Sequence, residues 1–312
     1  RRSGQEEWAG GVGRMSERNV ALRVVTDVVT AHRQLEGAGF AVFRPFPTHG
    51  LEMLDPFLML DEKEPKVYAP GEAKGAPDHP HRGFETVSYV LDGETEHRDS
   101  LGNRGIIGKG DVQWMTAGDG IVHCEMPSQR IQAEGGRTHG FQLWVNLPAE
   151  LKRTRPRYQA LTASDLPRAS GEGWTAVVIA GNVLGASGPA ATHTPIVYAH
   201  LTIQPGVALP IQIPNDHQVG LYVFAGSATA GGNSRRVDAH QLAVFAPGDG
   251  PVMASASTDG AEPMQALLMA GRPLDEPVAR HGPFVMNTRE ELIEALEDYQ
   301  AGRMGIIAPA GV

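Results

Sequence analysis

The sequence reads "DHPHRGFE" at residues 78–85 and "GIVHCEMP" at residues 120–127. Side chains at positions i and i+2 of a β-strand point to the same face of the sheet, so each stretch can present two ligands toward one point. The potential ligands are His79 and His81 in the first stretch, and His123 and Glu125 in the second. If the two strands face each other inside a barrel, we expect these four side chains to converge on one metal ion.

The metal interpretation depends on the second pair, because a lone His-x-His in a loop rich in proline and glycine is more typical of a solvated turn. The second pair lies in an apolar segment, where an unpaired histidine and glutamate would be costly to bury. A metal ion would offset that cost. The donors suit one divalent ion, for which we expect Fe(II), while Mn, Ni, Cu, Co and Zn are compatible with the same ligands.

The residues alone leave the identity of the carboxylate ligand open. Residues 79–85 resemble the general cupin pattern His-x-His-x(3,4)-Glu, which implies that Glu85 could be the ligand in place of Glu125. Glu85 could instead orient a ligating imidazole from behind. Cys124 lies between two proposed ligands and should therefore point to the opposite face of its strand, where we expect its thiol to fill the core.

The rest of the chain predicts an all-β protein. The 38 glycines and 23 prolines are scattered through the chain and separate short apolar segments that resemble antiparallel strands. Only one stretch predicts a helix: Thr288 and Glu291 form a capping box, and Leu292, Leu296 and Tyr299 follow at helical spacing. We expect this helix to run from near Thr288 to near Gly302 and to pack its apolar stripe on a barrel.

Charge and composition narrow the class of partner. The net charge of −9 offers no electrostatic footprint for nucleic acid or an anionic membrane. The single cysteine excludes an intrachain disulfide and fits a reducing compartment, and no run of about eighteen apolar residues is present. We therefore expect a cytoplasmic protein that binds a small molecule or another protein, and we expect it to be a monomer.

Five longer segments resemble the pirin family of the cupin superfamily. They are "FPTHGLEMLDPFLMLDE", "GAPDHPHRGFETVSYVLDGETEHRDSLGNRG", "GDVQWMTAGDGIVHCEMP", "HGFQLWVNLP" and "HGPFVMNTREEL". The likeness is dense over residues 37–160 and returns over residues 271–305. It implies a bicupin, with two antiparallel β-barrels of the jelly-roll type face to face and a metal, usually iron, in the N-terminal barrel only. It also implies that the ligands are His79, His81, His123 and Glu125, which favours Glu125 over Glu85 as the carboxylate.

The resemblance and the composition together suggest a division of the chain. We expect a disordered extension or cloning artefact over residues 1–16 and a metal-binding cupin barrel over 17–150. A linker should follow over 151–167, then a cupin barrel without metal over 168–286 and a helix with a tail over 287–312. At 312 residues, two domains are also the expectation from chain length.

Pirin relatives are similar to quercetin 2,3-dioxygenases, which implies that the protein opens the ring of a flavonol-like aromatic substrate with O2 and releases carbon monoxide. Glu125 could then accept the substrate's hydroxyl proton as a general base. The neighbours that could line the pocket are Arg82, Phe84, His97, Trp114, Met115 and His139. The alternative implied by other relatives is a regulatory protein whose iron senses redox state and changes affinity for a transcription factor or a metabolic enzyme.

Overall fold

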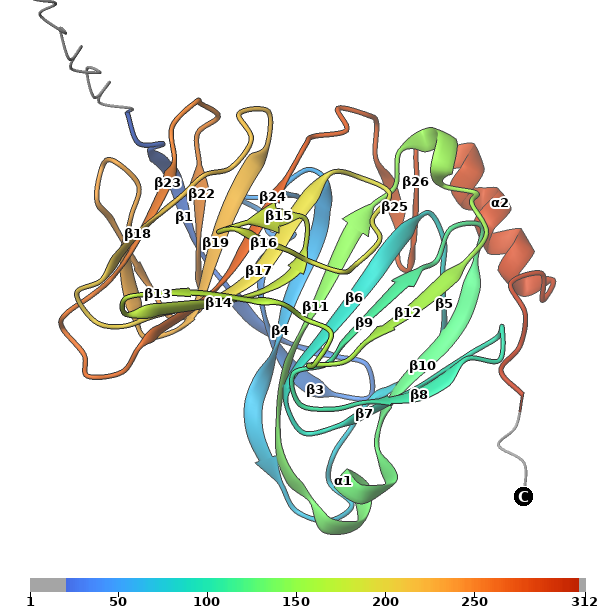
Figure 1. The fold of residues 1–312 in the computed structure, drawn as a ribbon. Helices are drawn as coiled ribbons and strands as arrows, with labels where there is room; N and C mark the ends of the chain where they lie inside the picture. Colours follow the sequence, from blue (N-terminus) through green and yellow to red (C-terminus); the bar gives the residue numbers. More distant parts are fainter. Residues whose placement is uncertain (1–20, 309–312) are drawn as a thin grey trace, which may run out of the picture.

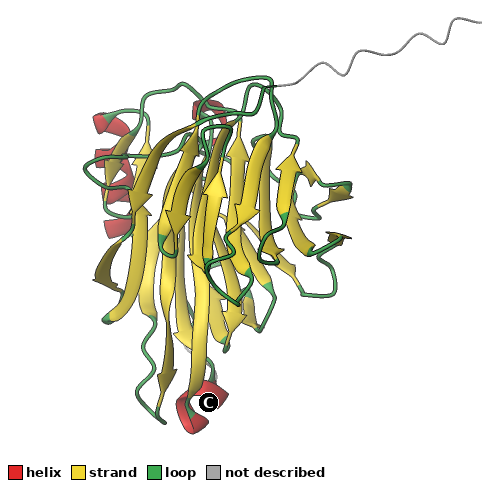
Figure 2. Cartoon of the chain, turned by 90° about the vertical axis from the view of Figure 1, so that its left-hand side faces the viewer, coloured by secondary structure: helices red, strands yellow, loops and turns green. Residues whose placement is uncertain are grey.

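The computed structural model describes residues 21–308 and confirms an all-β architecture of two lobes (Figure 1). Each lobe pairs a seven-stranded antiparallel sheet with a four-stranded one. The expected extension over residues 1–16 lies outside the described residues. Strands dominate the molecule, and the helices lie at its periphery (Figure 2). Within residues 21–308, no helix combines the length and apolarity that a membrane crossing needs.

The N-terminal lobe contains the sheets β12-β9-β6-β11-β4-β3-β2 and β5-β10-β7-β8. The strands of the first sheet are β12 (Arg157–Leu161), β9 (Val112–Thr116), β6 (Phe84–Asp92), β11 (Gly136–Asn146), β4 (Phe57–Tyr68), β3 (Phe40–Phe46) and β2 (His32–Glu36). Those of the second are β5 (Ala76–His81), β10 (Ile121–Pro127), β7 (Thr95–Asp99) and β8 (Arg104–Ile107). Two short helices, α1 (Gln129–Glu134) and the 3-10 turn η1 (Ala149–Leu151), flank β11.

The C-terminal lobe repeats this plan with the sheets β1-β22-β19-β24-β17-β14-β13 and β18-β23-β20-β21. The first comprises β1 (Val25–Thr30), β22 (Gln241–Phe245), β19 (Gln218–Ala225), β24 (Met264–Gly271), β17 (Ile196–Ile203), β14 (Trp174–Ala180) and β13 (Arg168–Gly171). The second comprises β18 (Ala208–Ile211), β23 (Val252–Ala256), β20 (Ser227–Ala230) and β21 (Arg235–Asp238). The remaining elements are the ribbons β15 (Asn182–Val183) with β16 (Ala186–Ser187) and β25 (Ala279–His281) with β26 (Phe284–Met286), and the helix α2 (Arg289–Gln300).

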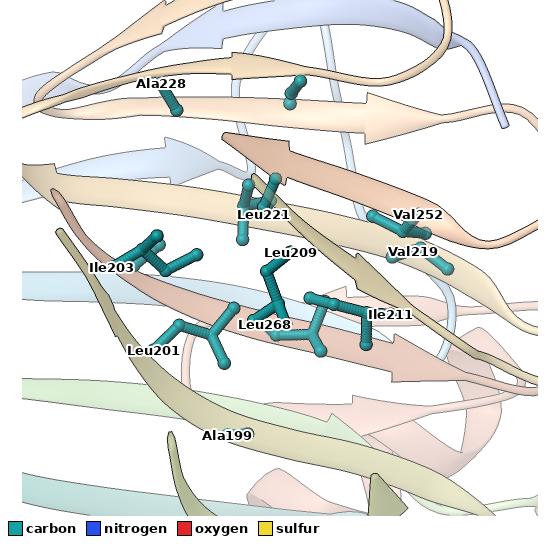
Figure 3. Packing of buried hydrophobic residues seen from close by; sticks show 14 of the residues in the cluster. Ala199, Leu201, Ile203, Leu209, Ile211, Val219, Leu221, Ala228, Val252 and Leu268 are labelled. Carbon is teal, nitrogen blue, oxygen red and sulfur yellow. The ribbon is translucent and has the colours of Figure 1, made fainter. Parts of the chain in front are cut away.

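The interior of the C-terminal lobe is filled with aliphatic side chains. Leu201 and Ile203 of β17 and Leu268 of β24 meet Leu209 and Ile211 of β18 across the gap between the sheets (Figure 3). All five side chains are buried. Close packing of this kind leaves the facing sheets in direct contact. Two histidines of this lobe, His217 and His240, are each hydrogen-bonded to a carboxylate.

The two seven-stranded sheets pack face to face and form a second core between the lobes. Phe57 and Leu60 of β4 and Trp114 of β9 belong to the same buried cluster as Tyr198 of β17 and Leu267 of β24. At the edge of this core, the buried carboxylate of Glu62 on β4 receives three hydrogen bonds. The donors are His139 (3.0 Å) from the same lobe, and Tyr222 (2.7 Å) and His240 (2.8 Å) from the other lobe.

The ends of the chain are exchanged between the lobes. β1 pairs with β22 and so belongs to the C-terminal lobe, although it precedes the whole N-terminal lobe in sequence. Conversely, β26 and α2 lie against the N-terminal lobe (Figure 1). The expected linker at residues 151–167 also differs, because its residues 157–161 form β12, which pairs with β9. The pairings therefore divide the chain differently from the expected boundaries, since hydrogen bonds between distant strands leave little trace in local sequence.

Helix α2 begins and ends where the sequence predicts, with Thr288 as the N-cap and a capping box to Glu291. Its contact face differs from the expected stripe. Within α2, Ala295 is fully buried, whereas Leu296 and Tyr299 remain 39% and 38% exposed. The helix covers the outer face of β10, where Ala295 packs in one cluster with Cys124. The expected core role of the Cys124 side chain fits this contact, because its side chain is 1% exposed.

The hydrogen bond from His240 to Glu62 should make the free energy of unfolding depend on pH near neutrality. That bond raises the pKa of His240 above its usual 6.5. A histidine with a raised pKa stabilises the folded state fully below its unfolded pKa, and this contribution disappears as the pH rises through the folded value. We expect urea denaturation between about pH 6 and about pH 9 to show this loss.

The variant His240→Asn should lack that component of the pH dependence. Asparagine tolerates the left-handed backbone at residue 240, where φ is 62°. The control is His32→Asn on the exposed strand β2, which should retain the wild-type profile. An unchanged pH profile in His240→Asn would show that the His240–Glu62 contact does not couple to folding.

Candidate metal centre and its cavity

The four-stranded sheet of the N-terminal lobe brings the two histidine motifs together. β5 and β10 are antiparallel neighbours, and His79 lies directly opposite His123 in their register. His81 precedes Gly83, whose φ is +90° and whose missing Cβ would lie 1.9 Å from the carbonyl oxygen of Val285. Only glycine fits this approach, so the tight turn after β5 holds the histidine strand against the C-terminal segment.

Three imidazoles form one compact group. The ligand atoms of His79, His81 and His123 all lie within 4.8 Å of one another. Their ring centroids are 4.3 Å apart for His79 and His123, 4.7 Å for His79 and His81, and 4.9 Å for His81 and His123. His81 and His123 are buried and His79 is half-buried, so the group is open to solvent on one side. It could hold a metal ion.

The polar atoms of this group fit such an ion. Both ring nitrogens of the fully buried His123 lack a hydrogen-bond partner among the described residues, which is costly unless a ligand satisfies one of them. Nδ1 of His79 lies 2.7 Å from the carbonyl oxygen of Pro77. Because a carbonyl can only accept, Nδ1 is the donor and Nε2 keeps its lone pair free. This arrangement is typical of a metal-ligating histidine.

The electrostatics keep the imidazoles in their metal-binding form. Burial lowers the pKa of His81 well below 6.5, and the neighbouring His79 lowers it further. Burial likewise lowers the pKa of His123, with contributions from His81 and His79. Both rings are therefore neutral at physiological pH, and neutral imidazole is the form that binds metal ions.

Glu125 lies on the same strand as His123 but is not part of the three-histidine group. Its Oε1 accepts hydrogen bonds from Ser88 Oγ (2.5 Å) and Gln113 Nε2 (3.1 Å). The side chain is half-buried and lines the same cavity as His79 and His81. Sequence reasoning missed Ser88 and Gln113, although each is a polar residue inside an apolar strand, which is the pattern that could have identified them.

The histidines line one wall of a cavity of about 560 Å³ inside the N-terminal lobe. Its walls come from β3, β4, β5, β6, β10 and β11 and from the turn between β25 and β26. The aromatic side chains along it are Phe40, Tyr89, Phe141 and Trp144. A concave, largely apolar site of this size is typical of small-molecule binding.

Of the six neighbours expected to line the pocket, His139 does so. Arg82 turns away from the cavity, donating to the carbonyl of Asp119 and forming an ion pair with Asp298 of α2 at 2.7 Å. Phe84 packs with Trp144 beside His81 but does not line the cavity. Met115 is buried in a small cluster with Ile121.

Trp114 and Glu85 face the interface between the lobes. Trp114 belongs to the core between the two large sheets. Glu85 lies on the same face of β6 as Val87, which is part of that core, and its carboxylate accepts a hydrogen bond from Thr116 at 2.6 Å. The alternation of side chains along β6 therefore directs Glu85 away from the histidines. The placement supports neither a ligand role nor an orienting role for Glu85.

His97 lies behind the three histidines. Strand β7 places it opposite Glu125 and places Asp99 opposite His123. The His97 ring is 5.4 Å from that of His123, stacks on Tyr158 at 4.8 Å, and has Nε2 3.2 Å from Asp99 Oδ2. His97 and Asp99 are fully buried and do not line the cavity, so they support the wall that carries His123.

Comparison with known proteins agrees with this architecture. The family model described as Pirin matches residues 39–145, and that of the Pirin C-terminal cupin domain matches residues 198–305. A pirin-like protein of Solanum lycopersicum is 42% identical over 284 residues, which cover 91% of this chain and 93% of that protein. Pirin of Homo sapiens is 40% identical over 286 residues, which cover 90% and 93%.

Solved structures share the same arrangement of two lobes. The crystal structure of a quercetin 2,3-dioxygenase from Acinetobacter baumannii superposes with a TM-score of 0.86 at 35% identity, covering 92% of this chain and 100% of that chain. The family matches fall on both lobes, and the relatives align along nearly the whole chain. With its two cupin domains and its group of three histidines, the chain belongs to the pirin family.

Proposed function

We propose that the protein is a metal-dependent dioxygenase that opens the ring of a quercetin-type flavonol with O2 and releases carbon monoxide. The observation that carries the proposal is the buried, unpartnered imidazole of His123 within a three-histidine group that lines an aromatic cavity. The solved relative named quercetin 2,3-dioxygenase supports the same class of substrate. We expect the metal to be Fe(II).

The chain supplies distinct parts of this reaction. His79, His81 and His123 would hold the ion, which would acidify a chelated flavonol hydroxyl and make the ligand electron-rich toward O2. Glu125 lines the cavity beside them, so either of its carboxylate oxygens could take the hydroxyl proton. Phe40 and Trp144 provide apolar surfaces for a flat substrate and exclude water around it.

The experiment that tests the proposal is carbon monoxide release from quercetin in air by Fe(II)-loaded protein. Release that disappears in His79→Ala would support a metal-dependent dioxygenase at this site. No release from protein shown to carry iron would overturn the proposal. Partner binding should then be compared with the iron in its two oxidation states, because the regulatory alternative requires that dependence.

A second variant separates a base from a ligand at position 125. Glu125→Gln is nearly isosteric and keeps an oxygen that can accept from Ser88, but it cannot take a proton. If Glu125 is the general base, we expect the variant to keep its metal and to lose about 10²- to 10⁴-fold in kcat. Metal content and carbon monoxide release should be measured on the same sample.

Glu96→Gln is the matched control, because Glu96 lies on the neighbouring strand β7 and pairs with Arg104 outside the cavity. It should retain wild-type turnover. Loss of the metal from Glu125→Gln would identify Glu125 as a ligand, and wild-type turnover with full metal content would exclude both roles.

A further inference from the structure

Lys63 points its ammonium into the cavity, where no carboxylate of residues 21–308 forms an ion pair with it. Strand β4 alternates between two faces, with Met59, Asp61 and Lys63 lining the cavity and Glu62 at the interface between the lobes. The Lys63 ammonium lies 5.2 Å from the centroid of the Phe40 ring. It also forms no hydrogen bond with a described residue. Burial lowers the pKa of Lys63, and the charge of Glu125 partly opposes that shift.

Arg280 adds a second cation to the same cavity, and it forms no ion pair within residues 21–308, although Asp61 and Glu36 act on its charge. Its guanidinium stacks over Trp144 at 4.7 Å, and the Trp144 ring in turn lies 5.2 Å from the ring of His81. Its one hydrogen bond to a described residue goes to the sulfur of Met59 at 3.8 Å, which is a weak acceptor. The residue is exposed, so the guanidinium lies where the cavity opens to solvent.

The other charges along the cavity are mostly committed elsewhere. Arg44 is paired with Asp61 at 2.6 Å and with Glu36 at 2.8 Å. Asp92 pairs with two basic side chains outside the cavity, and Glu94 pairs with a third. Two acidic groups remain: Asp78, which is exposed, and Glu125, which lies beside the proposed metal site. Among the described residues that line the cavity, Lys63 and Arg280 are therefore the cations without an ion pair.

We propose that Lys63 and Arg280 bind a carboxylate of the substrate, so that the cavity selects an aromatic carboxylate over an uncharged flavonol of the same shape. The inference rests on the proposed function in that the aromatic part of the same molecule lies beside the three histidines. With a divalent ion bound, Lys63, Arg280 and the ion would outweigh the acidic side chains that remain in this cavity, although the net charge of the chain is −9. That contrast favours an anionic ligand.

A matched pair of probes tests the selection directly. The first is 3-hydroxyflavone with a carboxylate on its phenyl ring, and the second carries a primary amide at the same position. Both keep the same chelating end, so their affinities differ through the carboxylate. Titration calorimetry with the zinc-loaded full chain measures binding without turnover. We expect the carboxylate to bind at least about tenfold more tightly than the amide, because its hydrogen bonds are charge-assisted.

Two conditions separate the cations from other sources of that preference. The preference for the carboxylate probe should persist in chelator-treated protein, because Lys63 and Arg280 act without the metal. A preference that arose from ligation of zinc by the carboxylate would disappear under the same conditions. It should also weaken as salt is raised, because an exposed guanidinium is screened. A preference present only with zinc would overturn the inference.

The variants Lys63→Met and Arg280→Met should each reduce the preference several-fold, and the double variant should remove it. Lys63→Arg keeps the charge and should keep the preference. The control is Lys66→Met, which changes an exposed lysine three positions along β4 whose ammonium lies over Tyr68, outside this cavity. Equal affinities of the two probes for the wild type, or a preference that survives in the double variant, would overturn the inference.

The outcome is separable from the proposed function. Release of carbon monoxide from quercetin together with equal probe affinities would support the dioxygenase function and contradict carboxylate binding by Lys63 and Arg280. A strong carboxylate preference without carbon monoxide release would retain the binding mode and reject the flavonol chemistry.

Discussion

Replacing His123 by leucine should stabilise the metal-free protein while it abolishes metal binding. In the metal-free state both ring nitrogens of His123 are buried without partners, and leucine removes them at similar volume. Relief of that desolvation should raise the free energy of unfolding by about 1–3 kcal/mol. The same change removes a member of the three-histidine group, so the affinity for the metal should fall at least about 100-fold.

Both halves of this result can be measured on one sample. Denaturation of chelator-treated protein gives the stability, and the rise in Tm on adding metal gives the binding. His49→Leu is the control, because His49 is exposed on a loop and should change neither quantity. A metal-free His123→Leu protein that is less stable than the wild type would show that the ring nitrogens find partners in solution, and retained metal would exclude His123 as a ligand.

Removing the Glu62 carboxylate should produce the largest loss of stability. Glu62→Leu leaves the buried donors of His139 and Tyr222, and the half-buried donor of His240, without an acceptor at the interface between the lobes. Burial raises the pKa of Glu62, but the three hydrogen bonds outweigh it and hold the pKa below its usual value, so the native group is charged. We expect the free energy of unfolding to fall by about 3–5 kcal/mol, the usual cost of breaking a buried polar network.

The control lies on the same strand. Glu64→Gln removes a carboxylate that pairs with the exposed Arg33, and such surface pairs contribute less than about 1 kcal/mol. Chemical denaturation of both variants gives the comparison. In a Tyr222→Phe background the loss caused by Glu62→Leu should shrink, because one fewer donor is stranded. Equal losses from Glu62→Leu and Glu64→Gln would contradict the proposed network.

Much of the architecture could be predicted from the sequence because its signals are local. Turn residues separate the strands, and Thr288 with Glu291 defines the start of α2. The i and i+2 spacing of His79 and His81 likewise places both imidazoles on one face. The meeting of these rings with His123 follows from strand pairing, which the resemblance to a known family supplied.

The orientation of the strands in the large sheet could not be predicted in the same way. β6 and β9 are buried on both faces, by the cavity side and by the second lobe, so apolar and polar residues do not alternate along them. Without alternation, nothing local indicates that Ser88 and Gln113 face Glu125 while Glu85 and Trp114 face the other lobe. Five of the six expected pocket residues do not line the cavity, because their side chains point elsewhere.

The exchange of chain ends has a consequence for how the protein can be divided. A fragment that stops after the N-terminal lobe keeps β1 without its partner β22 and loses the β26–α2 segment that covers the histidine strands. The complementary fragment has the opposite fault, with an open sheet edge and a helix that has no surface to cover. Each lobe is thus completed by residues from the far end of the chain. Neither lobe is therefore a self-sufficient folding unit. Removing β1 should destabilise the C-terminal lobe, and removing α2 should destabilise the N-terminal lobe.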